Sequence, residues 1–276
     1  MFSSKKLLFS GFSCLAYAMS VSSISAGEGT TSSNDKPEHG WSMADDYWDK
    51  DEMARSRAAV QKEHGATETF FVQADRLEYR SNEGNPVGLW DLQGWYGGDI
   101  NKLWIKTEGE YSFEEDTAED AEIQALWSRS IARYFDLQTG IRHDFEPGPS
   151  RTFGVIGVQG LAPYMFEVDA AAFFSEDGDA SIRVEAEYEI LLTQRLILQP
   201  RTELNFEFQD VPEYELGSGL SKAEAGLRLR YEIKRELAPY VGISWERAYG
   251  DTAEIIRASG EDVTSVSLVA GLRAWF

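Results

Sequence analysis

The stretch that decides the fold is SVSLVAGLRAWF, residues 265–276, in which apolar residues recur at every second position up to Phe276. The positions between them are more mixed and include two serines, Gly271 and Arg273. A period of two is the signal of a β-strand with one face in an apolar environment. A strand of this kind at the end of the chain suits a barrel, because the last strand of a barrel must pair with the first. The stretch therefore predicts the closing strand of a β-barrel.

The same period of two continues upstream and divides residues 67–276 into twelve expected strands. These strands cover 69–80, 87–97, 102–111, 119–129, 133–145, 152–161, 163–174, 179–192, 194–208, 219–234, 236–249 and 265–276. Strands of about ten residues cross a bilayer when tilted, and an even number is typical of single-chain bacterial barrels. Connections after odd-numbered strands are longer and acidic, whereas those after even-numbered strands are short. The sequence predicts an all-β fold, a transmembrane antiparallel up-and-down β-barrel in the outer membrane with both termini in the periplasm.

A soluble β-sandwich would show the same alternation, but its polar face would look at bulk water. In residues 179–192 the polar face instead carries arginine and glutamate together, as at Arg183 and Glu185. Aromatic residues lie near the expected strand ends, which is typical of a membrane interface. Nothing after Ala26 approaches the run of about 18 apolar residues that a membrane helix needs, so a barrel is the expected way to span the membrane.

The amino-terminal part of the chain reads as two segments that precede the barrel. Two lysines, an apolar stretch and small residues ending at Ala26 predict a secretory signal peptide. The single cysteine, Cys14, lies inside it. The next segment is polar and expected to be disordered, then helical over 49–63, where Asp49 precedes good helix formers. The expected parts are a signal peptide (1–26), a periplasmic segment (27–66) and the barrel (67–276).

The charge of the chain limits its partners. There are 47 acidic and 26 basic residues, which gives a formal net charge of −21. Such an excess of acids argues against nucleic acid and anionic surfaces and favours cations. The expected partners are therefore outer-membrane lipid and metal cations.

One expected strand presents candidate metal ligands toward the lumen. Met165, Glu167 and Asp169 alternate on a single face, and Glu185 and Glu187 on the following strand can supply further oxygen ligands. Carboxylates two residues apart can present oxygen atoms to a cation. In the alternative interpretation these acids pair with luminal arginines in a salt-bridge mesh. The candidate arginines for that mesh are Arg183, Arg201, Arg228 and Arg230.

A second group of candidate ligands precedes the barrel: His39, Met43, Met53 and His64. Thioethers suit Cu(I), and imidazole suits copper in either oxidation state. These residues predict copper binding by the amino-terminal segment, although solvated linker residues would give the same pattern. The remaining histidine, His143, alternates with apolar residues and is expected to point outward.

Seven segments together resemble the copper resistance protein B family. They are DEMARSRAAVQKEHGATETFFVQADRLEYR, GWYGGDINKLWIKTEGE, LQTGIRHDFEPGPSR, VQGLAPYMFEVDAAAFFSEDG, AEYEILLTQRLILQPRTELN, GSGL and GLRLRYEIKRELAPYVGISWER. The resemblance covers residue 50 to the end of the chain. It implies an outer-membrane protein of a Gram-negative copper-resistance system that binds copper as cargo and helps to keep the periplasm free of excess metal. A periplasmic copper protein is a further implied partner. Family members often carry a long region crowded with Met, His and Asp, and here that region is short.

Two other functions remain to be weighed against copper handling. The first is a general porin or passive structural barrel, which would conduct ions without metal selectivity. The second is an outer-membrane hydrolase of the phospholipase type, which needs a serine beside a histidine at the lipid-facing rim. His143 is the only histidine in the expected barrel, and no nucleophile motif lies near it. The chain is therefore expected not to be an enzyme.

Overall fold

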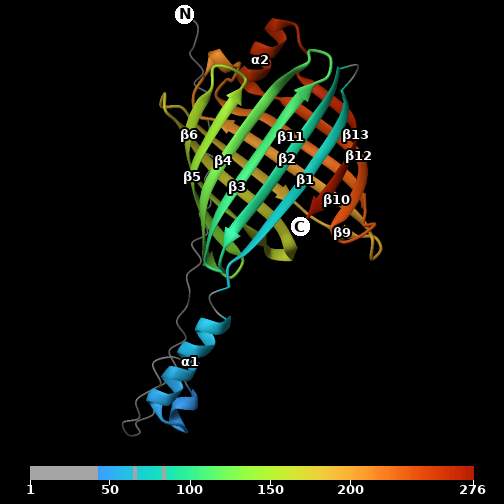
Figure 1. The fold of residues 1–276 in the computed structure, drawn as a ribbon. Helices are drawn as coiled ribbons and strands as arrows, with labels where there is room; N and C mark the ends of the chain where they lie inside the picture. The colour runs from blue at the N-terminus through green and yellow to red at the C-terminus, as the bar shows by residue number, and fades with distance from the viewer. Residues whose placement is uncertain (1–42, 65–66, 83–84) are drawn as a thin grey trace, which may run out of the picture. The chain divides into compact units, whose positions relative to one another are not determined.

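The computed structural model describes residues 43–64, 67–82 and 85–276 (Figure 1). The expected signal peptide, most of the polar stretch after it and His39 lie outside these ranges. None of the helices within the described ranges is long and apolar enough to cross a membrane.

Helix α1 (Lys50–His64) follows a 3₁₀ turn over Met43–Asp46. It begins where predicted, because the Asp49 carboxylate accepts a hydrogen bond from the Glu52 amide at 2.9 Å and caps the first turn. Two nitrogens of Arg57 donate to the two oxygens of Asp45, at 2.5 and 3.0 Å. This paired hydrogen bond lowers the pKa of the Asp45 carboxyl and ties the 3₁₀ turn to the helix.

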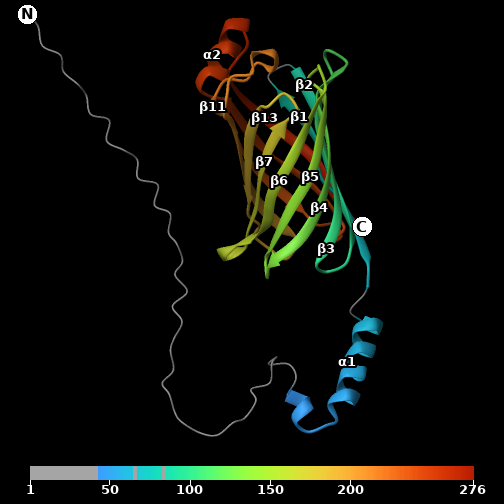
Figure 2. The same ribbon diagram turned by 90° about the vertical axis from the view of Figure 1, so that its left-hand side faces the viewer.

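The rest of the described chain is a closed antiparallel barrel (Figures 1 and 2). Its strands are β1 (Thr69–Asn82), β2 (Asn85–Gly97), β3 (Asn101–Ser112), β4 (Thr117–Ala132), β5 (Phe135–Glu146), β6 (Arg151–Ala162), β7 (Phe166–Ser175), β8 (Ala180–Glu187), β9 (Ile190–Leu191), β10 (Leu196–Glu207), β11 (Gly219–Tyr231), β12 (Leu237–Ala248) and β13 (Thr264–Trp275). The barrel closes because β13 pairs with β1. Since β8 and β9 both pair with β10, they form one interrupted span. The twelve predicted spans are confirmed.

The strands turn apolar side chains outward and polar ones inward, as β4 illustrates. Ile123 and Trp127 are exposed on the outer surface, whereas Glu122, Gln124 and Ser128 are buried inside. A water-soluble sandwich would bury the first set and expose the second. An apolar outer surface on a closed sheet instead matches a barrel whose solvent is lipid, because closure leaves no backbone edge unpaired.

The two ends of the barrel differ. At the end where β1 begins and β13 ends, here called the terminal end, the connections are short turns. The Phe276 backbone closes the barrel there through two hydrogen bonds with Val72, of 2.9 and 3.1 Å. The opposite end, here called the loop end, carries the longest connections and helix α2 (Gly250–Ser259), which Figures 1 and 2 both show away from the C-terminus. Buried Thr252 anchors α2 by hydrogen bonds with the Gly217 backbone.

One expected strand starts later than predicted. The expectation was a strand over 163–174, but β7 begins at Phe166. Pro163–Met165 forms a 3₁₀ turn instead, in which Tyr164 and Met165 both have φ of 67°. A positive φ takes a residue out of the alternation of a strand. The prediction that Met165 shares the inward face of Glu167 and Asp169 is therefore wrong.

Candidate metal-binding cavity

Arginine and glutamate side chains fill the middle of the lumen. The Arg228 guanidinium donates to both oxygens of Glu78 at 2.7 and 3.2 Å, and Arg80 donates to Glu224 at 2.9 Å. The members of this group, here called the luminal mesh, are Arg76, Arg80, Arg142, Arg183, Arg201, Arg228, Glu78, Glu108, Glu110, Glu122, Glu185, Glu203 and Glu224. Most of them are buried. The sequence predicted such a salt-bridge mesh as the alternative to a metal site.

An apolar cluster completes the filling on the side of β4, β6 and β7. Leu126, Phe153, Val155 and Phe173 are buried together inside the barrel. The Arg142 guanidinium lies 4.8 Å from the Phe173 ring centroid and 5.3 Å from that of Phe153, so the mesh and the cluster are in direct contact. Together they fill the middle of the lumen.

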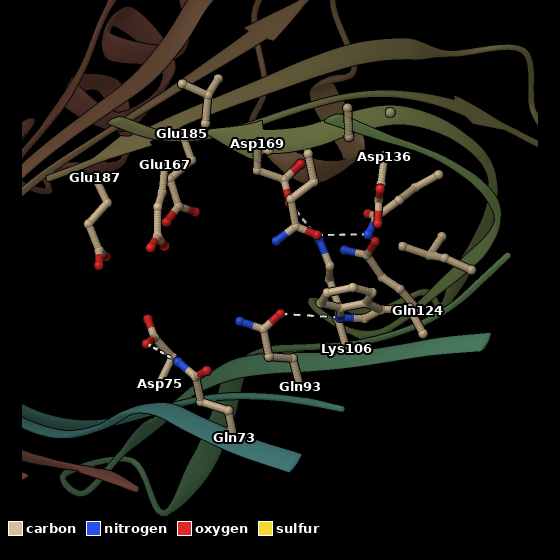
Figure 3. Close-up of a pocket in the computed structure, with 18 of the residues that line it drawn as sticks. Gln73, Asp75, Gln93, Lys106, Gln124, Asp136, Glu167, Asp169, Glu185 and Glu187 are labelled. Carbon is tan, nitrogen blue, oxygen red and sulfur yellow. Dashed lines mark hydrogen bonds and ion pairs between the residues drawn. The ribbon is translucent and has the colours of Figure 1, made fainter. Parts of the chain in front are cut away.

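Below the mesh, toward the terminal end, the lumen holds a cavity of about 560 Å³ (Figure 3). Its lining extends from the mesh to the turn between β4 and β5. Eight acidic residues line it: Asp75, Asp91, Glu108, Asp136, Glu167, Asp169, Glu185 and Glu187. Five basic residues line it: Lys102, Lys106, Arg133, Arg183 and Arg273. The excess of acids makes the cavity a site that attracts cations.

The structure brings all four of the predicted acids on β7 and β8 together in this cavity. Glu167 on β7 is directly opposite Glu187 on β8, and Asp169 is directly opposite Glu185. Asp169 is paired with the Lys106 ammonium at 2.5 Å, and two nitrogens of Arg201 reach the Glu185 oxygens at 2.6 Å each. In the described part of the chain, Glu167 makes neither a hydrogen bond nor an ion pair. The carboxylates thus divide into a pair with close counter-ions and a pair in which Glu187 alone has an ion pair, with Arg273 at 3.8 Å.

Asp75 and Arg273 are two of the cavity-lining residues that sequence reasoning did not single out. Asp75 sits in a β-bulge of β1, where the pairing with β2 shifts between Ala74 and Arg76. The bulge lets both Asp75 and its neighbour Arg76 face the lumen, which strict alternation forbids. Arg273 Nε lies 2.9 Å from Asp75 Oδ1. The adjacent charges Asp75 and Arg76 in an otherwise alternating strand were the available signal of the bulge.

The remaining predicted ligands lie elsewhere. Met165 is 67% exposed in its turn and does not line the cavity. Met43 lies in the 3₁₀ turn before α1, Met53 lies on α1, and His64 is its last residue. Within residues 43–64, 67–82 and 85–276, no three His, Cys, Asp or Glu side chains are grouped to hold a metal ion.

His143 faces outward, as predicted. Its Nδ1 lies 3.0 Å from the Thr152 hydroxyl, and its ring meets the edge of Phe145. Both its inward-facing neighbours, Arg142 and Asp144, belong to the lumen. The position of His143 on the outer wall separates it from the cavity.

The closed sheet, the apolar outer surface and the filled acidic lumen define an outer-membrane β-barrel protein. The family model for "Copper resistance protein B precursor (CopB)" matches residues 68–276, and the chain belongs to the copper resistance protein B family. Similar proteins include "Copper resistance protein B homolog" of Pseudomonas syringae pv. tomato, 46% identical over 228 residues (80% of this chain and 76% of that one). "Copper resistance protein B" of Escherichia coli is 43% identical over 213 residues (77% and 71%).

Solved structures include other barrels of this kind. The NanC porin structure covers 75% of this chain and 99% of its own, with a TM-score of 0.49 and 13% sequence identity.

Proposed function

We propose that this protein binds copper ions in the acidic cavity as the outer-membrane component of a copper-resistance system. The main support for this proposal is the excess of carboxylates over basic groups in a cavity that extends to one end of the barrel. The names of both relatives refer to copper resistance, which supports copper as the cargo among the cations that such a cavity attracts. The protein acts as a binder and not as an enzyme.

We place the terminal end in the periplasm. Short turns are typical of the periplasmic side of an outer-membrane barrel, and long loops are typical of the outside. With this orientation the cavity opens toward the compartment that copper resistance protects. The signal peptide over 1–26 and the periplasmic segment over 27–66 fit the same orientation.

The amino-terminal segment is a second place for copper in this proposal. His39, Met43, Met53 and His64 offer the imidazole and thioether ligands that the cavity lining lacks. Such ligands can capture copper from a periplasmic copper protein. In this proposal the soft ligands before the barrel capture copper first, and the oxygen ligands within the barrel bind it afterwards.

Of the two copper roles, the filled lumen favours sequestration over free passage. The luminal mesh lies between the cavity and the loop end, and its buried charges are held by several hydrogen bonds each. Passage would require these pairs to open at once, at the cost of leaving buried charges unpaired. Copper therefore accumulates on the terminal side.

Copper titration of the purified, detergent-folded protein tests the proposed function. Saturable binding that survives in high salt is expected, because specific ligands are screened less than a diffuse surface potential. Planar-bilayer recordings provide the comparison with a porin. Large steady conductance together with no saturable copper binding would replace the proposal with the passive-porin alternative.

A further inference from the structure

The cavity holds one pair of like charges that lacks a hydrogen-bonded counter-ion. Glu167 and Glu187 are direct cross-strand partners on β7 and β8. Like charges directly opposite each other destabilise a sheet. The neighbouring pair, Asp169 and Glu185, has the same arrangement, but Lys106 and Arg201 each supply a cation at 2.5–2.6 Å. The sheet thus provides close counter-ions for one pair, whereas the other has only the ion pair between Glu187 and Arg273 at 3.8 Å, which leaves room for an external cation.

Glu187 gives an independent sign of a missing ligand. The residue is only 5% exposed, and its Oε1 atom has no hydrogen-bond partner in the described structure. The nearest cation is Arg273, whose Nη1 lies 3.8 Å away, beyond hydrogen-bonding distance. Arg273 is already engaged by Asp75 at 2.9 Å and by Glu189 at 3.0 Å. An unsatisfied buried carboxylate oxygen carries a desolvation cost that a bound cation would remove.

The geometry of the cavity favours a ligand between the two walls. Figure 3 shows Glu167, Glu185 and Glu187 extending from one wall, with Asp75 and Gln73 facing them from the other. All five line the same cavity. A cation held by the Glu167–Glu187 pair would complete its coordination with water from the cavity, as hard divalent ions bound by two carboxylates do.

We propose that Glu167 and Glu187 form a divalent-cation site in the cavity and that its cargo is Cu(II), with Asp75 adding negative charge from the opposite wall. This inference rests on the proposed function and specifies the oxidation state. The described residues that line the cavity include no methionine, histidine or cysteine. Cu(I) prefers thioether and thiolate ligands, whereas carboxylate oxygens and water suit divalent ions, among which Cu(II) binds most strongly in the first-row series.

The test is paired titration of the full mature chain in detergent with Cu(II) and with Cu(I). We expect E187Q and E167Q each to lose one equivalent of Cu(II), or to bind it at least tenfold more weakly, and to keep Cu(I) binding unchanged. E232Q is the matched control, because it makes the same change of charge near the terminal end without touching the pair, and it should bind Cu(II) like the native protein.

Thermal unfolding of the metal-free protein gives a readout that does not depend on copper. E187Q should unfold at the same or a higher temperature than the native barrel, since it removes a like-charge contact, and should lose the upward shift that Cu(II) causes in the native protein. Unchanged Cu(II) binding by both variants, an equal loss in E232Q, or a destabilised metal-free E187Q would each overturn the site. If Cu(I) binds and Cu(II) does not, this inference fails and the proposed function stands. If neither ion binds, both fail.

Discussion

The Glu78–Arg228 pair allows the luminal mesh to be tested as a source of stability. The Glu78 side chain is fully buried, the Arg228 side chain is 2% exposed, and two hydrogen bonds join them. Replacing Glu78 with glutamine keeps the shape and removes the charge, which leaves the Arg228 guanidinium without its closest counter-ion. Breaking a buried pair in this way costs about 3–5 kcal/mol.

The lower end of that range applies here. Arg228 Nη2 also lies 3.8 Å from Glu224 Oε1, so part of the attraction remains. We expect E78Q to lower the free energy of unfolding by about 3 kcal/mol, a change on the order of 100-fold in the folding equilibrium. Urea unfolding in phospholipid vesicles, followed by tryptophan fluorescence, measures it.

Two comparisons make the measurement decisive. E232Q removes the acidic partner of Arg235 and should cost under about 1 kcal/mol, because Arg235 is 76% exposed and its charge stays hydrated without Glu232. Replacing Glu78 and Arg228 together by leucine and methionine should restore stability to within about 1 kcal/mol of the native protein, since neither charge of the pair is then left buried without the other. If E78Q unfolds like E232Q, the mesh does not hold the barrel together and the reasoning fails.

Three further predictions concern the ends of the chain and one loop. Deleting Phe276 removes two backbone hydrogen bonds to Val72 and should reduce the folded fraction seen by heat-modifiable electrophoresis, whereas replacing it with leucine should not. Removing residues 27–48 should leave barrel assembly intact and lower the copper bound per molecule, as measured by metal analysis. The Ser218 amide donates to Asp210 at 2.7 Å, and this hydrogen bond lowers the pKa of the Asp210 carboxyl. The loop over 208–218 should therefore resist proteases at neutral pH and become cleavable only when the pH falls below that lowered pKa.

The sequence was sufficient for the in-and-out pattern because a period of two is a local property. It placed twelve spans and the start of α1 at Asp49 within a few residues. It failed where the period is broken locally. No glycine or proline marks the bulge at Asp75, which turns this residue into the lumen. Pro163 does precede Met165, but the positive φ that removes Met165 from the strand was not predicted from it.

The pairing of the luminal charges could not be predicted from the sequence, for a different reason. Glu78 and Arg228 are 150 residues apart, and their contact depends on barrel diameter and strand stagger. Which carboxylate remains without a counter-ion is therefore a property of the closed barrel. That Glu187 has only a distant ion pair with Arg273 could be recognised only after Arg273 was seen to be engaged more closely by Asp75 and Glu189.

The inward-facing charges of the lumen also make a wrong strand register unfavourable during assembly. If β11 slipped by one residue against its neighbours, Arg228 and Arg230 would move from the lumen to the lipid surface. An arginine facing the middle of a bilayer costs about 2–4 kcal/mol, so two of them would make the slipped barrel far less stable than the correct one. The same slip on β1 would expose Arg76, Glu78 and Arg80 together. A chain shifted by one residue thus exposes charges to lipid and separates them from their luminal partners at once, which favours the native pairing.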